Sequence, residues 1–391
     1  MLGREDNVGF ALPFLTGIGV TYLVIKYFCD SYESILNISI LSSIFAFTPI
    51  IIALIFWKKI RESSKNINVY YLTLIVLMFF FLGVNSYVIS ELVGSWNGLN
   101  EVGNRAEQSR MVINITNKIS QIPYKNEESK HIVSSLLIGN KTGLSSQTIG
   151  WFRDSGAAHI LALSGLHLGL IYGVLKFILG ILGGNPWIKK ACSIIIIGLA
   201  GSYTYWTGAS PSLMRAFLFI TLRESANIIG RETKGIDIFC TALTIQLLIN
   251  PQIISSIGFQ LSYLAAAGIY FIYPYVKDWY ILPIRAILKD DDYNPPTGWR
   301  NPMRKIWELI SLSTICQLTT LPATWFYFGV FPKYFIITNL IAIPLSSLIL
   351  VSSMLLVGLG YLGFCPSILL TINEAMIQFL IFCLKTITEL P

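Results

Sequence analysis

Long stretches of apolar residues follow one another along most of the chain. Each is about as long as the roughly 20 residues that a helix needs to cross a bilayer. Ten lie at residues 8–28, 35–57, 69–90, 157–182, 190–207, 236–256, 257–276, 306–330, 335–360 and 367–388, and residues 211–229 also qualify despite two arginines. The pattern predicts an all-α fold, a polytopic transmembrane helical bundle of roughly eleven spans.

Residues 91–156 form the one sizeable segment without this character. Two stripes of apolar residues recur there at helical spacing, and the segment then continues through a glycine-flanked turn at 139–143 to a short helix that starts at Ser145. We expect short amphipathic helices lying on the membrane or on the bundle. The stripes are Met111, Val112, Ile115, Ile119 and Ile122, and then Ile132, Val133, Leu136 and Leu137.

Composition supports a membrane protein, because 54% of the 391 residues are hydrophobic and only 13% are charged. The net charge of +7 lies largely in three loops, at 58–65, 183–190 and 277–305. Lysine and arginine favour cytoplasmic loops. All three loops are cytoplasmic if the N-terminus is inside and the C-terminus outside, which places residues 91–156 on the outer face. The expected parts are N-terminal transmembrane helices at 1–90, outward-facing helices at 91–156 and the main transmembrane domain at 157–391.

Within the stretch HILALSGLHLGL, at 159–170, polar groups sit in an apolar segment. On one continuous helix over 157–182, Gly165, Gly169 and Gly173 would share a side and allow another helix to approach closely. His159, Ser164 and His167 would share a different arc, about 140° wide. Either each histidine simply bonds a neighbouring helix, or the arc faces a hydrated interior.

Other apolar segments also carry a polar side. Arginines occur at 215 and 223, eight residues apart, and the segment 306–330 carries polar residues at spacings of four, three and four. Buried acids are few, and Glu224 stands next to Arg223, which it could neutralise. A mildly cationic path suits an anionic substrate. The candidate lining residues are His159, Ser164, His167, Arg215, Arg223, Gln260, Ser262, Tyr263, Ser313, Gln317, Thr320 and Asn339, and Arg215, without an evident local partner, is expected to attract phosphates near the outer end.

Four stretches, in order, resemble the ComEC family of bacterial competence channels. They are LLIGNKTGLSSQTIGWFRDSGAAHILALSGLHLGLI at 136–171, YTYWTGASPSLMRAFLF at 203–219, INPQIISSIGFQLSYLAAAG at 249–268 and QLTTLPATWFYFGVFPKYFIITNLIAIPLSS at 317–347. The resemblance implies a multi-pass channel of the inner (cytoplasmic) membrane, with residues 157–391 as the channel domain, which takes up single-stranded DNA. It also implies four kinds of partner: an outer-face DNA receptor, a cytosolic ATPase or helicase, a separate nuclease for the second strand, and membrane lipids.

Long members of that family also carry an OB-fold domain and a metallo-β-lactamase-like nuclease domain. Residues 91–135 are too few for a five-stranded barrel, and three unclustered histidines give no metal signature. We therefore expect a channel core without catalytic residues, metal or cofactor.

Two other functions stay open on the sequence. A transporter or flippase for another anion would use the same arginines. An intramembrane serine protease would use Ser210 in GASPS with His167 as its base, although Pro211 removes a backbone N–H beside that serine.

Overall fold

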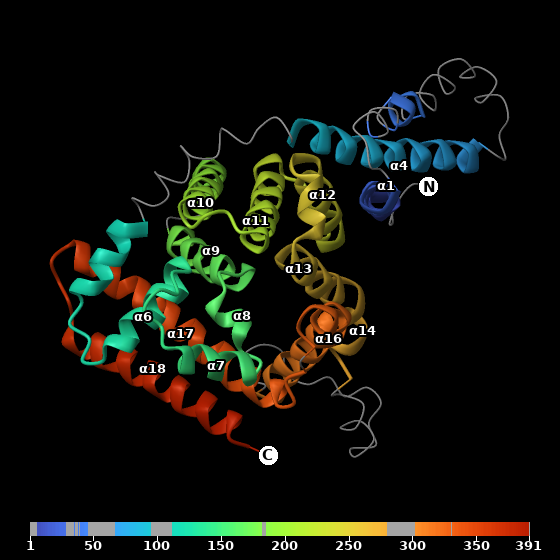
Figure 1. Ribbon diagram of the computed structural model, residues 1–391. Coiled ribbons are helices and arrows are strands. Elements are labelled where there is room, and N and C mark those ends of the chain that lie inside the picture. Colours follow the sequence, from blue (N-terminus) through green and yellow to red (C-terminus); the bar gives the residue numbers. More distant parts are fainter. Residues whose placement is uncertain are drawn as a thin grey trace, which may run out of the picture. The chain divides into compact units, whose positions relative to one another are not determined.

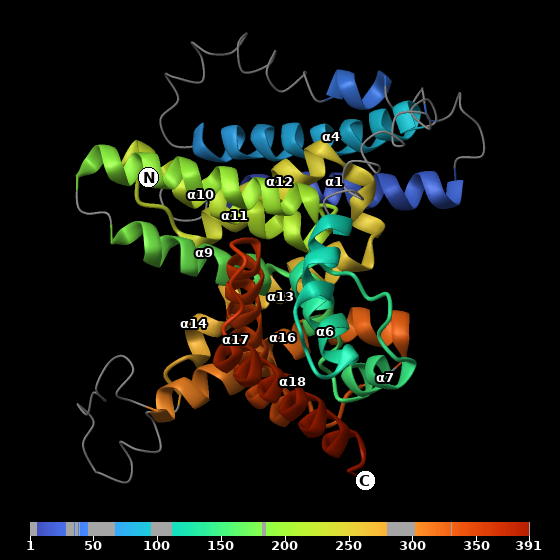
Figure 2. The ribbon, with the colours of Figure 1, turned by 90° about the vertical axis from the view of Figure 1, so that its left-hand side faces the viewer.

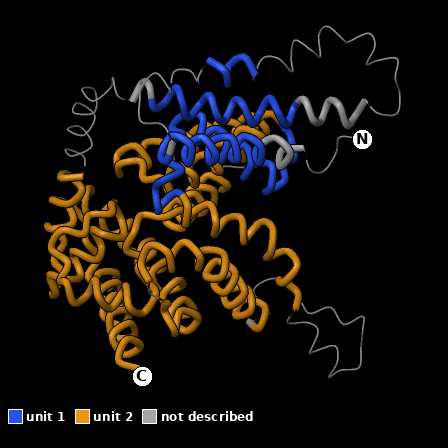
Figure 3. The backbone as a smooth tube through the Cα atoms, turned by 45° about the vertical axis from the view of Figure 1, so that its right-hand side comes forward, with its two compact units in different colours: residues 1–103, 230–259 blue, residues 104–229, 260–391 orange. Residues whose placement is uncertain are grey.

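The computed structural model describes residues 6–28, 35, 38, 40–45, 67–94, 112–181, 185–279, 302–329 and 331–390. All regular secondary structure within these ranges is helical, which confirms the all-α prediction. The chain divides into two compact units (Figure 3), residues 1–103 with 230–259, and residues 104–229 with 260–391. Residues 230–259 thus belong with the N-terminal unit, and the three parts expected from the sequence stay a prediction.

The first unit contains three helices that correspond to expected spans: α1 (Asp6–Phe28), α4 (Ile67–Gly94) and α12 (Gly235–Ile249), followed by the short η1 (Pro251–Ser255). Helices α1 and α4 pack at two glycines. A methyl group on Gly17 would collide with the Phe80 carbonyl, and one on Gly83 would collide with the Phe14 carbonyl. Most of the span expected at 35–57 lies outside the described residues.

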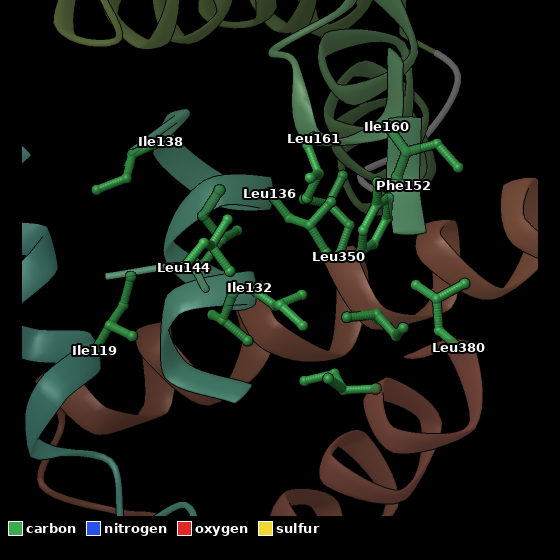
Figure 4. Packing of buried hydrophobic residues seen from close by; sticks show 14 of the residues in the cluster. Ile119, Ile132, Leu136, Ile138, Leu144, Phe152, Ile160, Leu161, Leu350 and Leu380 are labelled. Carbon is green, nitrogen blue, oxygen red and sulfur yellow. The ribbon is translucent and has the colours of Figure 1, made fainter. Parts of the chain in front are cut away.

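The second unit opens with short helices at residues 112–121, α6 (Glu127–Ile138), α7 (Ser146–Asp154) and α8 (Ala158–Leu161). Ser145 caps α7 by accepting a hydrogen bond from the Thr148 amide, as the sequence indicated. The two apolar stripes are confirmed as helix faces, except that Ile122 lies just beyond the helix at 112–121 and Met111 lies outside the described residues. Figure 4 shows Ile119, Ile132 and Leu136 packed in one core with side chains of α17 (Phe335–Tyr361) and α18 (Ser367–Thr388).

A buried polar group also holds this segment to the long helices. Asn373 of α18 accepts a hydrogen bond from the Tyr124 hydroxyl at 2.9 Å and donates to the hydroxyls of Ser352 and Ser353 on α17 at 2.8 and 2.9 Å. Burial raises the pKa of the Tyr124 phenol well above its usual range, so it remains a donor.

The segment 112–156 extends along α17 from one end to the other. Gly156 lies against Pro332 and Phe335, at the start of α17, whereas the Lys118 ammonium lies 5.5 Å from the centre of the Tyr361 ring at its end. The outward-facing position expected for residues 91–156 stays a prediction.

The remainder of the second unit comprises α9 (Gly165–Gly180), α10 (Pro186–Trp206), α11 (Pro211–Ile229), and a second group formed by α13 (Ile257–Ala267), the π-helical η2 (Gly268–Ile272), α14 (Tyr273–Val276) and α16 (Pro302–Phe328). Helices α9, α10 and α11 lie side by side around a small core that includes Leu168, Ile196 and Leu213. In Figures 1 and 2, α17 runs in a different direction from these three helices.

Two of the described helices, α17 and α18, are long and apolar enough to cross a membrane. Shorter apolar helices lie at Ala11–Tyr27, Ile75–Glu91, Gly165–Gly180 and Gly235–Ile249. The structure thus confirms helices at most of the expected positions, but it does not confirm a bundle of roughly eleven spans.

Candidate functional site

The segment 157–182 is not one continuous helix, contrary to expectation. It breaks at residues 162–164, between α8 and α9. Ser164 caps α9: its Oγ accepts from the Leu166 amide at 3.3 Å, and the Nδ1 of His167 accepts from the Ser164 amide at 3.2 Å. His167 is 3% exposed. Its placement is explained by this reciprocal cap, which satisfies amides that a helix start leaves unpaired.

The helix break also separates the two histidines. His159 lies on α8, is exposed, and its Nδ1 is 3.2 Å from the Gly156 carbonyl oxygen. The three residues His159, Ser164 and His167 therefore do not form a single polar arc on one helix.

Arg215 on α11 lies at the centre of several expected site residues. Its Nη1 donates to the Ser262 carbonyl on α13 at 2.6 Å, and its guanidinium carbon is 5.9 Å from the centre of the Tyr263 ring. The Nη2 lies 3.1 Å from where a methyl group on Gly165 would stand. Arg215, Ser262, Tyr263 and Gly165 therefore come together from α9, α11 and α13, and Arg215 does have a local partner, a backbone carbonyl.

One edge of the Arg215 guanidinium is left unpaired. The Nε atom is buried and has no hydrogen-bond partner among the described residues, and no carboxylate there lies within 4 Å of the guanidinium. The Nε–H and one N–H of Nη2 point in the same direction and can bind two oxygens of one phosphate or carboxylate. Since an unpaired buried donor costs stability, this edge is the feature that points most directly to an anionic ligand.

The second arginine behaves differently. Arg223 is exposed. Glu224, expected to neutralise it, is instead 2% exposed and accepts four hydrogen bonds from α9, α10 and its own helix. The donors are Tyr172 Oη at 2.6 Å, Lys176 Nζ at 3.1 Å, Ser193 Oγ at 2.6 Å and Asn227 Nδ2 at 3.2 Å.

This Glu224 cluster was not expected. The sequence shows only the i, i+4 pair Tyr172–Lys176 and the i, i+3 pair Glu224–Asn227, and such pairs are common on exposed helix faces. The contact depends on how α9, α10 and α11 pack.

The polar stripe of α16 is largely satisfied within its own helix. The Thr320 hydroxyl donates to the Cys316 carbonyl at 2.7 Å, and the Thr324 hydroxyl to the Thr320 carbonyl at 3.2 Å. Ser313 is buried, while Gln317 and Gln260 are half-buried. Asn339 on α17 is buried and its Oδ1 has no partner in the described part of the chain. The role of these residues in lining a path stays a prediction.

Of the three glycines expected to form a packing face, only Gly165 lies against another helix. Open space surrounds Gly169 and Gly173 within the described residues. Among the described residues, the glycines that lie against the backbone of another helix are Gly17 and Gly83, between α1 and α4, and Gly268 of η2 lies against side chains of α16.

The geometry gives no support to a serine nucleophile. The Ser210 hydroxyl lies 3.5 Å from the Leu163 carbonyl oxygen, and the His167 Nδ1 is occupied by Ser164. Among the described residues no group of three or more His, Cys, Asp or Glu side chains is arranged to hold a metal ion.

Comparison with known proteins shows what the region around Arg215 is similar to. The family model "Competence protein" matches residues 136–391. ComE operon protein 3 of Bacillus subtilis (strain 168) is 24% identical over 217 residues, 56% of this chain and 25% of that protein. The uncharacterized protein YcaI of Escherichia coli (strain K12) is 27% identical over 227 residues, 56% of this chain and 28% of that protein.

Recombination protein 2 of Haemophilus influenzae (strain ATCC 51907 / DSM 11121 / KW20 / Rd) is 23% identical over 244 residues, 60% of this chain and 29% of that protein. The chain thus matches between a quarter and three tenths of the length of these relatives. No solved structure matches.

Proposed function

We propose, because this chain belongs to the Competence protein family, that it takes part in DNA uptake as the core of a membrane channel for single-stranded DNA. The observation that carries the proposal is the unpaired Nε edge of Arg215, held between three helices in the matched region. A nucleic-acid strand carries one phosphate per nucleotide. A single arginine edge without a nearby carboxylate can bind any one of these phosphates.

The surroundings of Arg215 fit transient contact with a strand. The Tyr263 and Phe219 rings flank the guanidinium, with ring centres 5.9 and 5.5 Å from its central carbon, and bases can stack on such rings without sequence preference. The Ser262 carbonyl fixes the other side of the guanidinium. Because Nε is buried in this structure, phosphate reaches it only when the surrounding helices separate, and we propose that this structure is the closed state of the path.

The same proposal includes a multi-pass position in the cytoplasmic membrane, with the N-terminus inside and the C-terminus outside. It further includes an outer-face DNA receptor, a cytosolic ATPase or helicase and a separate nuclease as partners. Among the described residues, the helical fold and the long apolar helices α17 and α18 support a membrane protein. The number of spans and the partners are part of the proposal.

A transporter or flippase for another anionic substrate is the second candidate, since an arginine edge binds any phosphate. The two functions differ in what a cell loses without the protein. A strain that lacks the DNA-uptake channel fails to take up labelled DNA, whereas loss of a flippase leaves DNA uptake intact.

The experiment uses a deletion strain supplied with the wild-type chain, Arg215→Gln or Arg223→Gln, and measures internalised labelled single strands at matched protein levels. Arg223 is a suitable control because it lies on the same helix and is exposed. Losing a charge-assisted contact with phosphate should lower uptake at least about tenfold for Arg215→Gln. Arg223→Gln should resemble wild type.

The results separate the alternatives. Normal uptake in the deletion strain removes the DNA-channel function and favours the flippase. If uptake is absent in the deletion strain and normal with Arg215→Gln, the channel function stands but Arg215 does not contact the DNA strand.

A further inference from the structure

Helix α10 presents an apolar face that no described residue of its own unit covers. Its exposed residues recur at helical spacing, with Trp187 80% exposed, Ile194 61% and Leu199 47%, and end at Tyr205 and Trp206. The opposite face carries Ser193, Ile196, Ala200 and Thr204, which are buried. One side of helix α10 therefore packs on the protein, where α9 and α11 are its neighbours (Figure 1), and the other side is exposed.

The length and ends of this face match a lipid bilayer. From Trp187 to Trp206 the helix rises about 28 Å, close to the roughly 30 Å thickness of the hydrocarbon core. Tryptophan and tyrosine favour both boundaries of the membrane. The only hydroxyl in the middle of the exposed side, Ser202, donates to the Gly198 carbonyl of its own helix at 2.9 Å. It therefore needs no water.

Helix α17 is longer and more apolar than most. One side of it shares a buried core with α6 and residues 112–121, whereas Leu348 and Leu355 are exposed. Length and hydropathy alone therefore do not show which face of a helix meets lipid.

The beginning of α10 carries two positive charges that no acidic group of the described chain pairs with. Lys189 and Lys190 stand in its first turns, and no acidic residue accompanies them there. Cations near a helix N-terminus oppose the helix dipole. The Lys190 ammonium lies 5.8 Å from the centre of the Trp187 ring, and neither lysine forms an ion pair with a described residue.

We propose that Trp187, Lys189 and Lys190 at the start of α10 bind the headgroup of an anionic phospholipid, with the apolar face of α10 against its acyl chains. The inference rests on the membrane position included in the proposed function. Two ammonium groups beside an interfacial tryptophan match a lipid phosphate in charge, and the apolar stripe beginning at the same residues matches the tails.

The test uses the purified full-length chain in neutral detergent, without DNA. Native mass spectrometry measures retained phosphatidylglycerol and phosphatidylcholine, and competition with glycerol 3-phosphate separates a lipid from a free phosphate. The variant is Lys189→Gln with Lys190→Gln. The control removes two other exposed lysines, Lys141→Gln with Lys333→Gln, and circular dichroism checks that each variant folds.

We expect the wild type and the control to retain phosphatidylglycerol preferentially, with glycerol 3-phosphate failing to displace it. The variant should bind phosphatidylglycerol about thirtyfold more weakly, from about fivefold per lysine near an anionic surface. Equal retention of both lipids by the wild type, unchanged preference in the variant, or displacement by glycerol 3-phosphate would each overturn the proposal. Failure of DNA uptake does not affect this measurement, so the two proposals fail separately.

Discussion

Gly165 lies directly against the Arg215 guanidinium because a glycine has no side chain. A side chain on Gly165 would stand 3.1 Å from Nη2 and 3.4 Å from the Ala216 Cβ. Gly165→Ala should therefore displace the guanidinium edge by a few tenths of an ångström and lower DNA uptake, with about tenfold, the loss of one charge-assisted contact, as the upper limit. Uptake of labelled DNA at equal protein level is the measurement.

Gly169→Ala is the matched control for this substitution. Gly169 lies one turn further along α9, where an added methyl group meets no atom within 4 Å among the described residues. Gly165 is the first residue of α9 and Gly169 lies inside it, so the gain in helix propensity is larger for Gly169→Ala. Equal uptake in the two variants would show that the distance between Gly165 and Arg215 does not matter.

At the scale of helices, the crossing of α1 and α4 makes a second prediction. Gly17 of α1 meets the α4 backbone at Phe80, and Gly83 of α4 meets the α1 backbone at Phe14. Neither position has room for a side chain. Gly17→Ala should force the helices apart and cost about 1–3 kcal/mol of unfolding free energy. Thermal unfolding in detergent measures it. Gly19→Ala, on the same helix in open space, should be neutral or stabilising, and a similar loss in both variants would contradict the close crossing.

Glu224 makes the third prediction, because its carboxylate connects α9, α10 and α11. In Glu224→Gln one oxygen acceptor becomes an NH₂ donor, which faces donors such as Ser193 or Tyr172. The expected cost is about 2–3 kcal/mol of unfolding free energy, as for hydrogen bonds to a buried charged group. Lys176→Gln removes only a half-exposed partner and should cost at most about 1 kcal/mol.

The two variants together identify the group that matters. Equal destabilisation would mean that the ion pair, rather than the carboxylate and its hydroxyl donors, connects the helices.

Helix positions could be read from the sequence, because apolar length and helical spacing are local properties. The expected segment 211–229 coincides with α11, and 367–388 coincides with α18. The break at Ser164 was missed, since the apolar pattern continues through it and only the reciprocal cap with His167 reveals it. The glycines Gly169 and Gly173 share a helix face, but which face another helix covers depends on tertiary packing. The contacts of Gly17, Gly83 and Glu224 also depend on tertiary packing, so the sequence does not predict them.

For the molecule as a whole, the Competence protein region is not packed only against itself. The family model matches residues 136–391, and within that range residues 230–259 belong to the unit that contains residues 1–103. Helix α12 packs against α1, and Gln252 donates to the Glu91 carboxylate at 3.1 Å. Residues outside the matched region therefore complete the packing of residues inside it.

The last prediction follows from this discontinuous unit. A chain of residues 104–391 leaves α12, whose buried residues include Phe239 and Leu247, without its packing partner α1. It should accumulate poorly in membranes and fail to support DNA uptake. Co-expression of residues 1–103 as a separate chain should restore both, because α1 and α4 can pair with each other and then with α12. Residues 1–103 carrying Gly17→Val should not restore them, since the α1–α4 crossing has no room for valine. Normal accumulation and uptake by residues 104–391 alone would show that the N-terminal helices are dispensable for the packing of α12.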